Sequence, residues 1–336
     1  MKFVSVVPEN LLERIREPTS RFYSDYLAYK RGEIRWTELI AQLPHVAMIG
    51  DSVSTGIHVT TTWSTFWRAR SCHDNNWFLN LDPGKEIQSV SERLERFAPF
   101  VAIHCAGVGA MIDDYGEGEA FSRRILGTRN FSGQINQLLL SKRFPDLILI
   151  SIGHNNVDWA WRSPPDELAR PQERLPRLSR HLHKIFARQL RRLLEHARAE
   201  RHRVAIIVFG LINFGAYFKG REEAERRREK EPTLYPHLET TYKYLISFRP
   251  DYRENVIRLA AMVNNELRTM VNEFSGELAN TNVYLRYSGA LATADLSRAE
   301  LLHAVDGWHA SVKGHNVLAE SAFADLSPSL EFLGIS

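Results

Sequence analysis

Short apolar runs alternate with longer amphipathic stretches along the chain, and this alternation restricts its fold more than any other feature. Five runs rich in Val, Ile and Leu have the length of buried strands. They are His45–Ile49, Phe100–Cys105, Asp146–Gly153, Arg203–Gly210 and Asn282–Tyr287. Helical patterns lie between them, most clearly at Asn130–Phe144, Glu173–Arg201 and Tyr252–Leu278. The alternation predicts a parallel five-stranded sheet covered by helices on both faces, with ligands bound at the carboxyl ends of the strands.

Three segments exceed what such a sheet requires. Residues 1–44 predict a helical lead-in that includes Asn10–Arg16 and Arg21–Arg31. Residues 156–175 are rich in Pro and Trp, and residues 211–251 combine aromatic residues with a dense charge run. We interpret residues 1–336 as one domain in which 156–175 and 211–251 are insertions and candidate lids.

The charge run Arg221–Lys230 lies inside the second insertion. Its Arg and Glu residues recur at the four-residue spacing that forms ion pairs on a helix surface. We interpret the run as a solvated helix rather than as a specific anion site.

Composition excludes several classes of protein. The formal net charge is only +3, which does not indicate nucleic-acid binding. Two cysteines, Cys72 and Cys105, are too few for a disulfide framework. The first residues lack the apolar core of a signal peptide, and no segment approaches the roughly 20 apolar residues that span a bilayer. We therefore expect a cytoplasmic protein without a transmembrane segment, for which export by a signal-independent route and peripheral membrane contact stay open. Its oligomeric state does not follow from the sequence.

Polar or glycine-rich motifs follow the first three predicted strands. Gly50-Asp51-Ser52 ends the first, and Ser52 would stand at a helix N-terminus, where free N–H groups stabilise negative charge. His104-Cys-Ala-Gly-Val-Gly109 ends the second, and its glycines would let a backbone N–H approach a ligand. Gly153-His154-Asn155-Asn156 ends the third, and the Asn155 amide could point into a cleft. Helix capping, strand packing and turn formation are the respective alternatives.

A fourth motif, Asp306-Gly-Trp-His309, follows the fifth predicted strand. A serine hydroxyl becomes a good nucleophile when a base takes its proton and a carboxylate orients that base. An Asp three residues before a His can place both side chains in one cleft. The alternative is a surface turn with an incidental His.

Taken together, the four motifs resemble those of the SGNH (GDSL) hydrolase family. Their order is G-D-S-x-S, a glycine turn, G-x-N and D-x-x-H-x-S-x-x-G-H, and the resemblance covers roughly residues 45–325. It implies a three-layer α/β/α flavodoxin-like sandwich and a serine ester hydrolase that works through an acyl-enzyme without metal or cofactor.

The resemblance also assigns roles to single residues. Ser52 resembles the nucleophile, His309 the base and Asp306 the carboxylate that orients it. The oxyanion hole would consist of the N–H groups of Ser52 and Gly109 and the side-chain amide of Asn155. Beyond the triad, we expect Asp51, His154 and Trp308 to contact the substrate.

Two positions depart from the family pattern. Asn156 stands where the third block usually has Asp, and His104 where the second block usually has Asn. Neither residue would take part directly in the chemistry, although both alter the polar network behind the oxyanion hole. Gly314 and His315 resemble the start of the closing helix of the family and are interpreted as structural.

The substrate is constrained less strongly. The D-G-W-H sequence and the large insertions are similar to phospholipase B-type members, which favours a small-molecule or lipid ester. Trp63, Trp67, Trp77 and Phe78 follow the nucleophile and would line the same cleft or belong to the core. A carbohydrate O-acetyl esterase and a catalytically weak binding module with the same fold are the alternatives. Neither the acyl group, the alcohol nor the pathway follows from the sequence.

Overall fold

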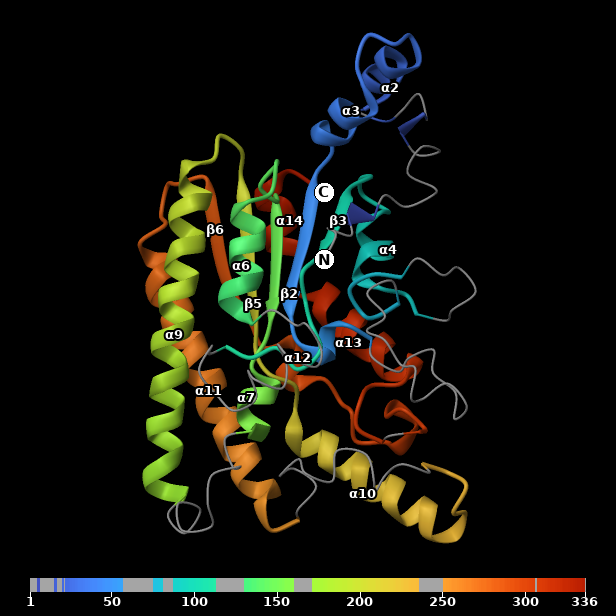
Figure 1. Cartoon of the computed structure of the whole chain (residues 1–336), viewed down its shortest axis with the longest axis vertical. Coiled ribbons are helices and arrows are strands. Elements are labelled where there is room, and N and C mark those ends of the chain that lie inside the picture. Colours follow the sequence, from blue (N-terminus) through green and yellow to red (C-terminus); the bar gives the residue numbers. More distant parts are fainter. Residues whose placement is uncertain are drawn as a thin grey trace.

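A mostly parallel sheet forms the centre of the molecule (Figure 1). The computed structural model describes residues 5–6, 15–16, 20, 22–56, 75–80, 87–112, 130–159, 171–235, 250–305 and 307–335. Within these residues the sheet has six strands in the order β1-β3-β2-β4-β5-β6. The parallel strands are β3 (Val101–His104), β2 (His45–Gly50), β4 (Leu147–Ser151), β5 (Val204–Phe209) and β6 (Val283–Ser288). All five predicted strands are confirmed.

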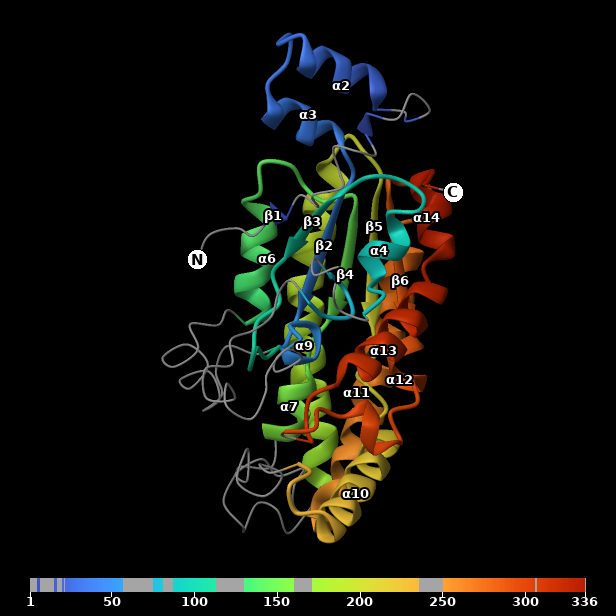
Figure 2. The same cartoon turned by 90° about the vertical axis from the view of Figure 1, so that its right-hand side faces the viewer.

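The inner strands are buried along their whole length, because helices cover both faces of the sheet. Three helices lie on one face of the sheet and three others on the opposite face (Figures 1 and 2). The first group consists of α6 (Phe131–Leu139), α9 (Pro171–Ala199) and α11 (Pro250–Gly276). The second consists of α4 (Val90–Leu94), α13 (Val312–Ala324) and α14 (Ser327–Leu333). The predicted α/β/α sandwich is therefore confirmed.

The N-terminal segment differs in part from the prediction. Helix α2 (Tyr23–Lys30) agrees with the helix predicted at Arg21–Arg31, whereas residues 10–14 lie outside the described residues. Helix α3 (Trp36–Gln42) lies within the predicted helical lead-in, although its own bounds were not predicted, because it buries only Leu39. The two-residue strand β1 (Ser5–Val6) pairs antiparallel with β3, in a segment for which helix was expected.

The same segment lies at the end of the sheet opposite to the predicted site. Helix α3 leads directly into β2, and both views place α2 and α3 beyond the amino ends of the strands (Figures 1 and 2). A small apolar cluster holds this segment to the sheet at Val101.

The two insertions are described only in part. Helix α7 (His154–Trp159) begins the first, and residues 160–170 lie outside the described residues. Helix α10 (Phe214–Lys230) forms the start of the second, and residues 236–249 lie outside. Among the described helices, none is long and apolar enough to cross a membrane.

Candidate active site

The loop that carries Ser52 is fixed by the backbone of Gly50, the last residue of β2. Gly50 N–H donates to Gln134 Oε1 over 2.9 Å, and Gln134 Nε2 donates to the Gly50 carbonyl over 2.9 Å. Gln134 lies on α6 and is fully buried. A Cβ atom on Gly50 would stand 2.6 Å from the Ser151 carbonyl, so no larger residue fits here. The strand therefore ends at a defined point, and the short 3-10 turn η1 (Ser52–Ser54) follows it.

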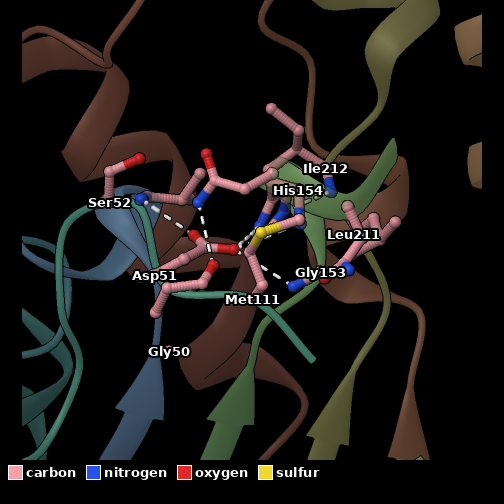
Figure 3. Close-up of polar contacts among 12 residues, drawn as sticks. Gly50, Asp51, Ser52, Met111, Gly153, His154, Leu211 and Ile212 are labelled. Atoms are coloured by element: carbon pink, nitrogen blue, oxygen red, sulfur yellow. Dashed lines mark hydrogen bonds and ion pairs between the residues drawn. The ribbon is translucent and has the colours of Figure 1, made fainter. Parts of the chain in front are cut away.

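Asp51 connects this loop to the loop after β4. Its Oδ1 accepts the N–H of Val53 over 3.1 Å, which makes Asp51 the N-cap of η1. Its Oδ2 accepts the N–H groups of Gly153 and His154, each over 3.1 Å, and the ring Nδ1 of His154 over 2.8 Å (Figure 3). The side chain is fully buried. The expected contact of Asp51 with substrate stays a prediction, and both of its carboxylate oxygens accept hydrogen bonds from the protein.

His154 extends the connection to a third strand. Its Nε2 accepts the N–H of Ile212, just after β5, over 3.1 Å (Figure 3). Because Nε2 accepts, Nδ1 carries the hydrogen that Asp51 receives, and this fixes the tautomer. Both ring nitrogens are therefore used to hold the loops after β2, β4 and β5 together. The expected contact of His154 with substrate stays a prediction; the residue lines the same cavity as Ser52, with both ring nitrogens bonded to the protein.

His104 ties the second motif to the same place. The residue is buried at the end of β3, and its Nε2 donates to the Ser54 carbonyl over 2.9 Å. The N–H of Gly107, three residues later, donates to the Gly50 carbonyl over 3.0 Å. The side chain that departs from the family pattern thus holds the nucleophile loop against β3.

Gly109 lies in the loop after β3, and Asn155 lies in the first turn of α7, which follows β4. Gly109 has a φ of +72°, a conformation that favours glycine. The Asn155 side-chain amide donates to the carbonyl of Ala110, the residue after Gly109, over 2.9 Å. Asn156 Oδ1 accepts the N–H of Ile112 over 2.7 Å. The amide of Asn156 therefore supplies an acceptor where the family usually has a carboxylate.

The loop that carries His309 folds back on itself. His303 N–H donates to the His309 carbonyl, and Gly307 N–H donates to the His303 carbonyl, each over 2.8 Å. Gly307 has a φ of +59°, which favours glycine at this turn. Asp306 lies outside the described residues, so its orienting contact with His309 stays a prediction.

Helix α10 braces this loop through two side chains. Arg221 Nη1 donates to the Gly307 carbonyl over 3.2 Å, and the Tyr217 hydroxyl donates to the same carbonyl over 3.4 Å. Arg221 Nε also pairs with Glu225 over 3.0 Å. Because Arg221 is 4% exposed, the prediction of a solvated helix is wrong for this residue. It holds for Arg227, which forms an i,i+4 pair with Glu223 at the surface.

A sequence signal for the buried arginine was available. Phe214, Tyr217 and Phe218 stand at i, i+3 and i+4, and Arg221 continues the same face at i+7. The aromatic residues of this face are buried. This position on the buried face, rather than its charge, was the signal that Arg221 is buried as well.

One cavity brings together most of the predicted site residues. Ser52, His154, Asn155, Trp308 and His309 all line it, and its volume is about 40 Å³. Its apolar wall includes Ile212, Phe214, Tyr217, Leu296, Leu302 and Leu318. Trp308 packs edge to face on Tyr217, with ring centroids 5.1 Å apart. Within the described ranges, no three His, Cys, Asp or Glu side chains are grouped as a metal site requires.

The tryptophans that follow Ser52 belong elsewhere or are not described. Trp77 and Phe78 are fully buried in the main core, so they are not part of the wall of this cavity. Trp63 and Trp67 lie outside the described residues.

His315, on the first turn of α13, is the most strongly perturbed titratable group near the cavity. Burial, together with smaller effects of the nearby His309 and His303, lowers its pKa to about 3. Its Nδ1 accepts the N–H of Trp77 over 3.3 Å, which requires a neutral ring nitrogen. The expectation of a structural role agrees with this burial.

The depressed pKa of His315 predicts acid sensitivity of the fold. Above pH 6.5 the residue is neutral in both folded and unfolded chains, so it contributes no pH dependence there. As the pH falls from 6.5 toward 3, only the unfolded chain gains the proton, and the free energy of unfolding decreases. The decrease attributable to His315 is about 2 kcal/mol at pH 5, from about 1.4 kcal/mol per pH unit.

Urea unfolding at pH 7.5 and pH 5 measures this contribution. The difference between the two free energies of unfolding should be about 2 kcal/mol smaller in His315→Gln than in the parent chain. His181→Gln, at an exposed histidine of α9, is the control and should keep the parent difference. An unchanged difference in His315→Gln would contradict the assignment.

Comparisons with known proteins agree with the motifs. A family model described as GDSL-like Lipase/Acylhydrolase matches residues 46–322. No curated protein matches the sequence. Similar solved structures include the lipase Lip_vut3 from a goat rumen metagenome, with 14% identity, a TM-score of 0.44 and coverage of 84% of this chain and 96% of that chain.

Two further solved structures are similar at the same level. The inhibitor-bound aryl esterase of M. smegmatis has 13% identity and a TM-score of 0.45, with coverage of 85% and 99%. Phospholipase A1 from Streptomyces albidoflavus NA297 has 12% identity and a TM-score of 0.43, also with coverage of 85% and 99%. Because all three TM-scores lie below 0.5, the specificity of these enzymes does not transfer to this chain.

Proposed function

Because the chain belongs to the family of GDSL-like lipases and acylhydrolases, we propose that it hydrolyses a carboxylic ester through an acyl-enzyme on Ser52. The observation that carries the proposal is the shared cavity of Ser52, Asn155 and His309. These residues are far apart in sequence: Ser52 lies in η1 after β2, Asn155 in α7 after β4, and His309 in the loop before α13. A nucleophile, a base and an amide donor on one apolar cavity are the groups that acyl transfer needs.

The reaction begins with the attack of Ser52 Oγ on the ester carbonyl carbon. His309 takes the hydroxyl proton as the C–O bond forms, and Asp306 orients the imidazole. The carbonyl oxygen becomes negatively charged and receives hydrogen bonds from the N–H groups of Ser52 and Gly109 and from the Asn155 amide. Each such preset donor is worth about 3–4 kcal/mol in the transition state.

The acyl-enzyme forms when the bond to the alcohol breaks. His309 returns its proton to the leaving alkoxide, so that a neutral alcohol departs. Water then enters, and His309 takes one of its protons while the oxygen attacks the acyl carbon. Collapse of the second tetrahedral intermediate transfers the proton back to Ser52 and releases the carboxylic acid.

The wall of the cavity supports an apolar acyl group. Phe214 and Tyr217 of α10, Leu302, Trp308 and Leu318 surround the space next to Ser52. The ring nitrogens of His154 and the Nδ1 of His315 are occupied by protein partners, so these histidines add little polarity. Each methylene of an acyl chain buried against such a wall would contribute about 0.8 kcal/mol of binding free energy.

Hydrolysis of p-nitrophenyl esters of increasing chain length tests the substrate class. We expect kcat/KM to rise from acetate to butyrate or hexanoate, by about three- to fourfold per buried methylene. Ser52→Ala protein is the blank for spontaneous hydrolysis. A sharp maximum at acetate would contradict the apolar acyl group and favour the carbohydrate O-acetyl esterase instead.

A binding module without catalysis is the second candidate, and the Asn156 substitution is the feature that favours it. Asn156 Oδ1 accepts the N–H of Ile112, so the amide still supplies an oxygen acceptor where the family usually has a carboxylate. This acceptor supports the enzyme over the binding module. Labelling by a fluorophosphonate probe separates the candidates. Covalent labelling of Ser52, located by peptide mass, is expected, whereas folded protein that stays unlabelled would support the binding module.

A further inference from the structure

The solvent face of helix α9 carries an unbroken row of basic side chains. Between residues 177 and 191 every exposed residue of the helix is Arg, Lys or His. These residues, called here the basic stripe, are Arg177, Arg180, His181, Lys184, Arg188 and Arg191. The acidic residues of α9, Glu173 and Glu195, stand before and after the stripe. The helix holds eight Arg and Lys and two Glu, so it contributes +6 to a chain whose formal charge is +3.

The stripe is a straight surface feature with a fixed orientation. Its members recur every three or four residues, which places them on one side of a helix over about 21 Å. The opposite side is held in the core by the buried residues Leu182, Phe186, Leu190 and Leu193. The helix therefore cannot rotate to hide the stripe.

Four cations of the stripe differ from those of the neighbouring helices in their ion pairs with described residues. Among the described residues, none forms an ion pair with Arg177, Arg180, Lys184 or Arg188. On α10 and α11, by contrast, exposed Arg227 and Arg258 pair with Glu residues four positions away. Like charges at these spacings weaken a helix. An anionic partner would remove that repulsion.

The stripe extends toward the candidate active site. Helix α9 ends five residues before β5 begins, so its N-terminal end lies at the carboxyl ends of the parallel strands. Ser52 follows β2 directly, so it lies at the same end of the sheet. A surface that contacts the start of the stripe is thus near the end of the sheet at which Ser52 lies.

We propose that the basic stripe of α9 docks the protein on an anionic phospholipid surface. A row of exposed cations matches a plane of negatively charged headgroups, to which each Lys or Arg adds binding strength. Nucleic acid is the less suitable partner because the stripe contains no aromatic side chain for base stacking. The docking goes beyond the proposed ester hydrolysis and does not depend on the chemistry at Ser52.

Sedimentation with vesicles tests the docking. The full chain is mixed at low salt with one of two kinds of vesicle. One is pure phosphatidylcholine, and the other is phosphatidylcholine that contains about 30% phosphatidylglycerol. We expect binding to the anionic vesicles alone, and weaker binding as salt is added. Each cation strengthens such binding about fivefold, so the triple variant Arg180→Glu, Lys184→Glu, Arg188→Glu should lose at least about 100-fold in affinity.

A second triple variant keeps the same change of net charge but leaves the stripe intact. It carries Arg96→Glu, Arg258→Glu and Arg268→Glu, at exposed positions outside α9, and should bind vesicles nearly as well as the parent chain. Equal loss in both triple variants would overturn the proposal, as would binding of a single-stranded oligonucleotide but not of the anionic vesicles.

Soluble p-nitrophenyl butyrate separates docking from catalysis. Without vesicles, the stripe variant should keep the parent rate, and Ser52→Ala protein should keep the parent affinity for vesicles. If the chain binds vesicles but lacks esterase activity, the proposed function fails and the docking stands. If it hydrolyses the ester but ignores anionic vesicles, the docking alone fails.

Discussion

Replacement of Ser52 by alanine is expected to lower kcat for ester hydrolysis by about 10⁶-fold, which would leave only the activity of the blank. The change removes one hydroxyl from a turn that is held by the backbone of Gly50 and by Asp51. The fold should therefore be unaffected, with a melting temperature within about 2 °C of the parent. Replacement of His309 by alanine removes the base and should cost a similar factor, because nucleophile and base act as one unit.

Ser54→Ala is the matched control in the same turn. The Ser54 side chain is fully buried, and its hydroxyl has no hydrogen-bond partner in the described part of the chain. Its removal should keep kcat within about twofold and stability within about 1 kcal/mol. Initial rates with p-nitrophenyl butyrate, together with thermal melts of all three variants, provide the comparison. Retained activity in Ser52→Ala, or equal loss in Ser54→Ala, would refute the assignment of the nucleophile.

The five parallel strands could be predicted because burial on both faces of the sheet leaves a strong apolar signal in the sequence. The runs that became β2 to β6 are short, rich in Val, Ile and Leu, and separated by long amphipathic helices. A parallel sheet then brings the residues after each strand to one edge. Ser52, Asn155 and His309 could be placed together for this reason, without knowledge of any side-chain contact.

The contacts behind the site could not be predicted, because they depend on the direction of individual side chains. Asp51 and His154 each fit a ligand-facing role by residue type, yet their polar atoms also join the loops after β2, β4 and β5. These hydrogen bonds, to the N–H groups of Gly153 and Ile212 among others, follow no sequence period. Strand β1 was missed for a related reason, since a strand of two residues has no period to detect.

The role of Arg221 was missed because charge was weighted above helical position. The surrounding run Arg221–Lys230 is mostly exposed, as a solvated helix requires. Of the charged residues in this run, only Arg221 is buried, and it continues the buried face of Phe214, Tyr217 and Phe218. A buried arginine needs a partner with fixed geometry, and here the partner is a backbone carbonyl of the loop that carries His309.

Arg221→Met should therefore lower kcat far more than it lowers stability. The Met side chain fills a similar volume but gives the Gly307 carbonyl no hydrogen bond, so this carbonyl loses the Arg221 donor and keeps that of Tyr217. A displacement of about 1 Å at a catalytic group costs about 100-fold in rate. We therefore expect kcat to fall by roughly 10- to 100-fold. Because the cavity wall is unchanged, KM should stay within about threefold.

Three measurements distinguish positioning of His309 from a general loss of structure. Steady-state kinetics give kcat and KM separately, the rate of fluorophosphonate labelling reports activation of Ser52, and urea unfolding reports stability. Arg221→Lys keeps a donor near Gly307 and should recover part of the rate. Arg227→Met removes an exposed arginine from the same helix and should behave like the parent chain. If Arg221→Met lost activity only in proportion to its unfolded fraction, or if Arg227→Met lost as much, α10 would be an ordinary packing helix. A loss of kcat in folded Arg221→Met protein would instead make α10 the element that holds the catalytic base in place.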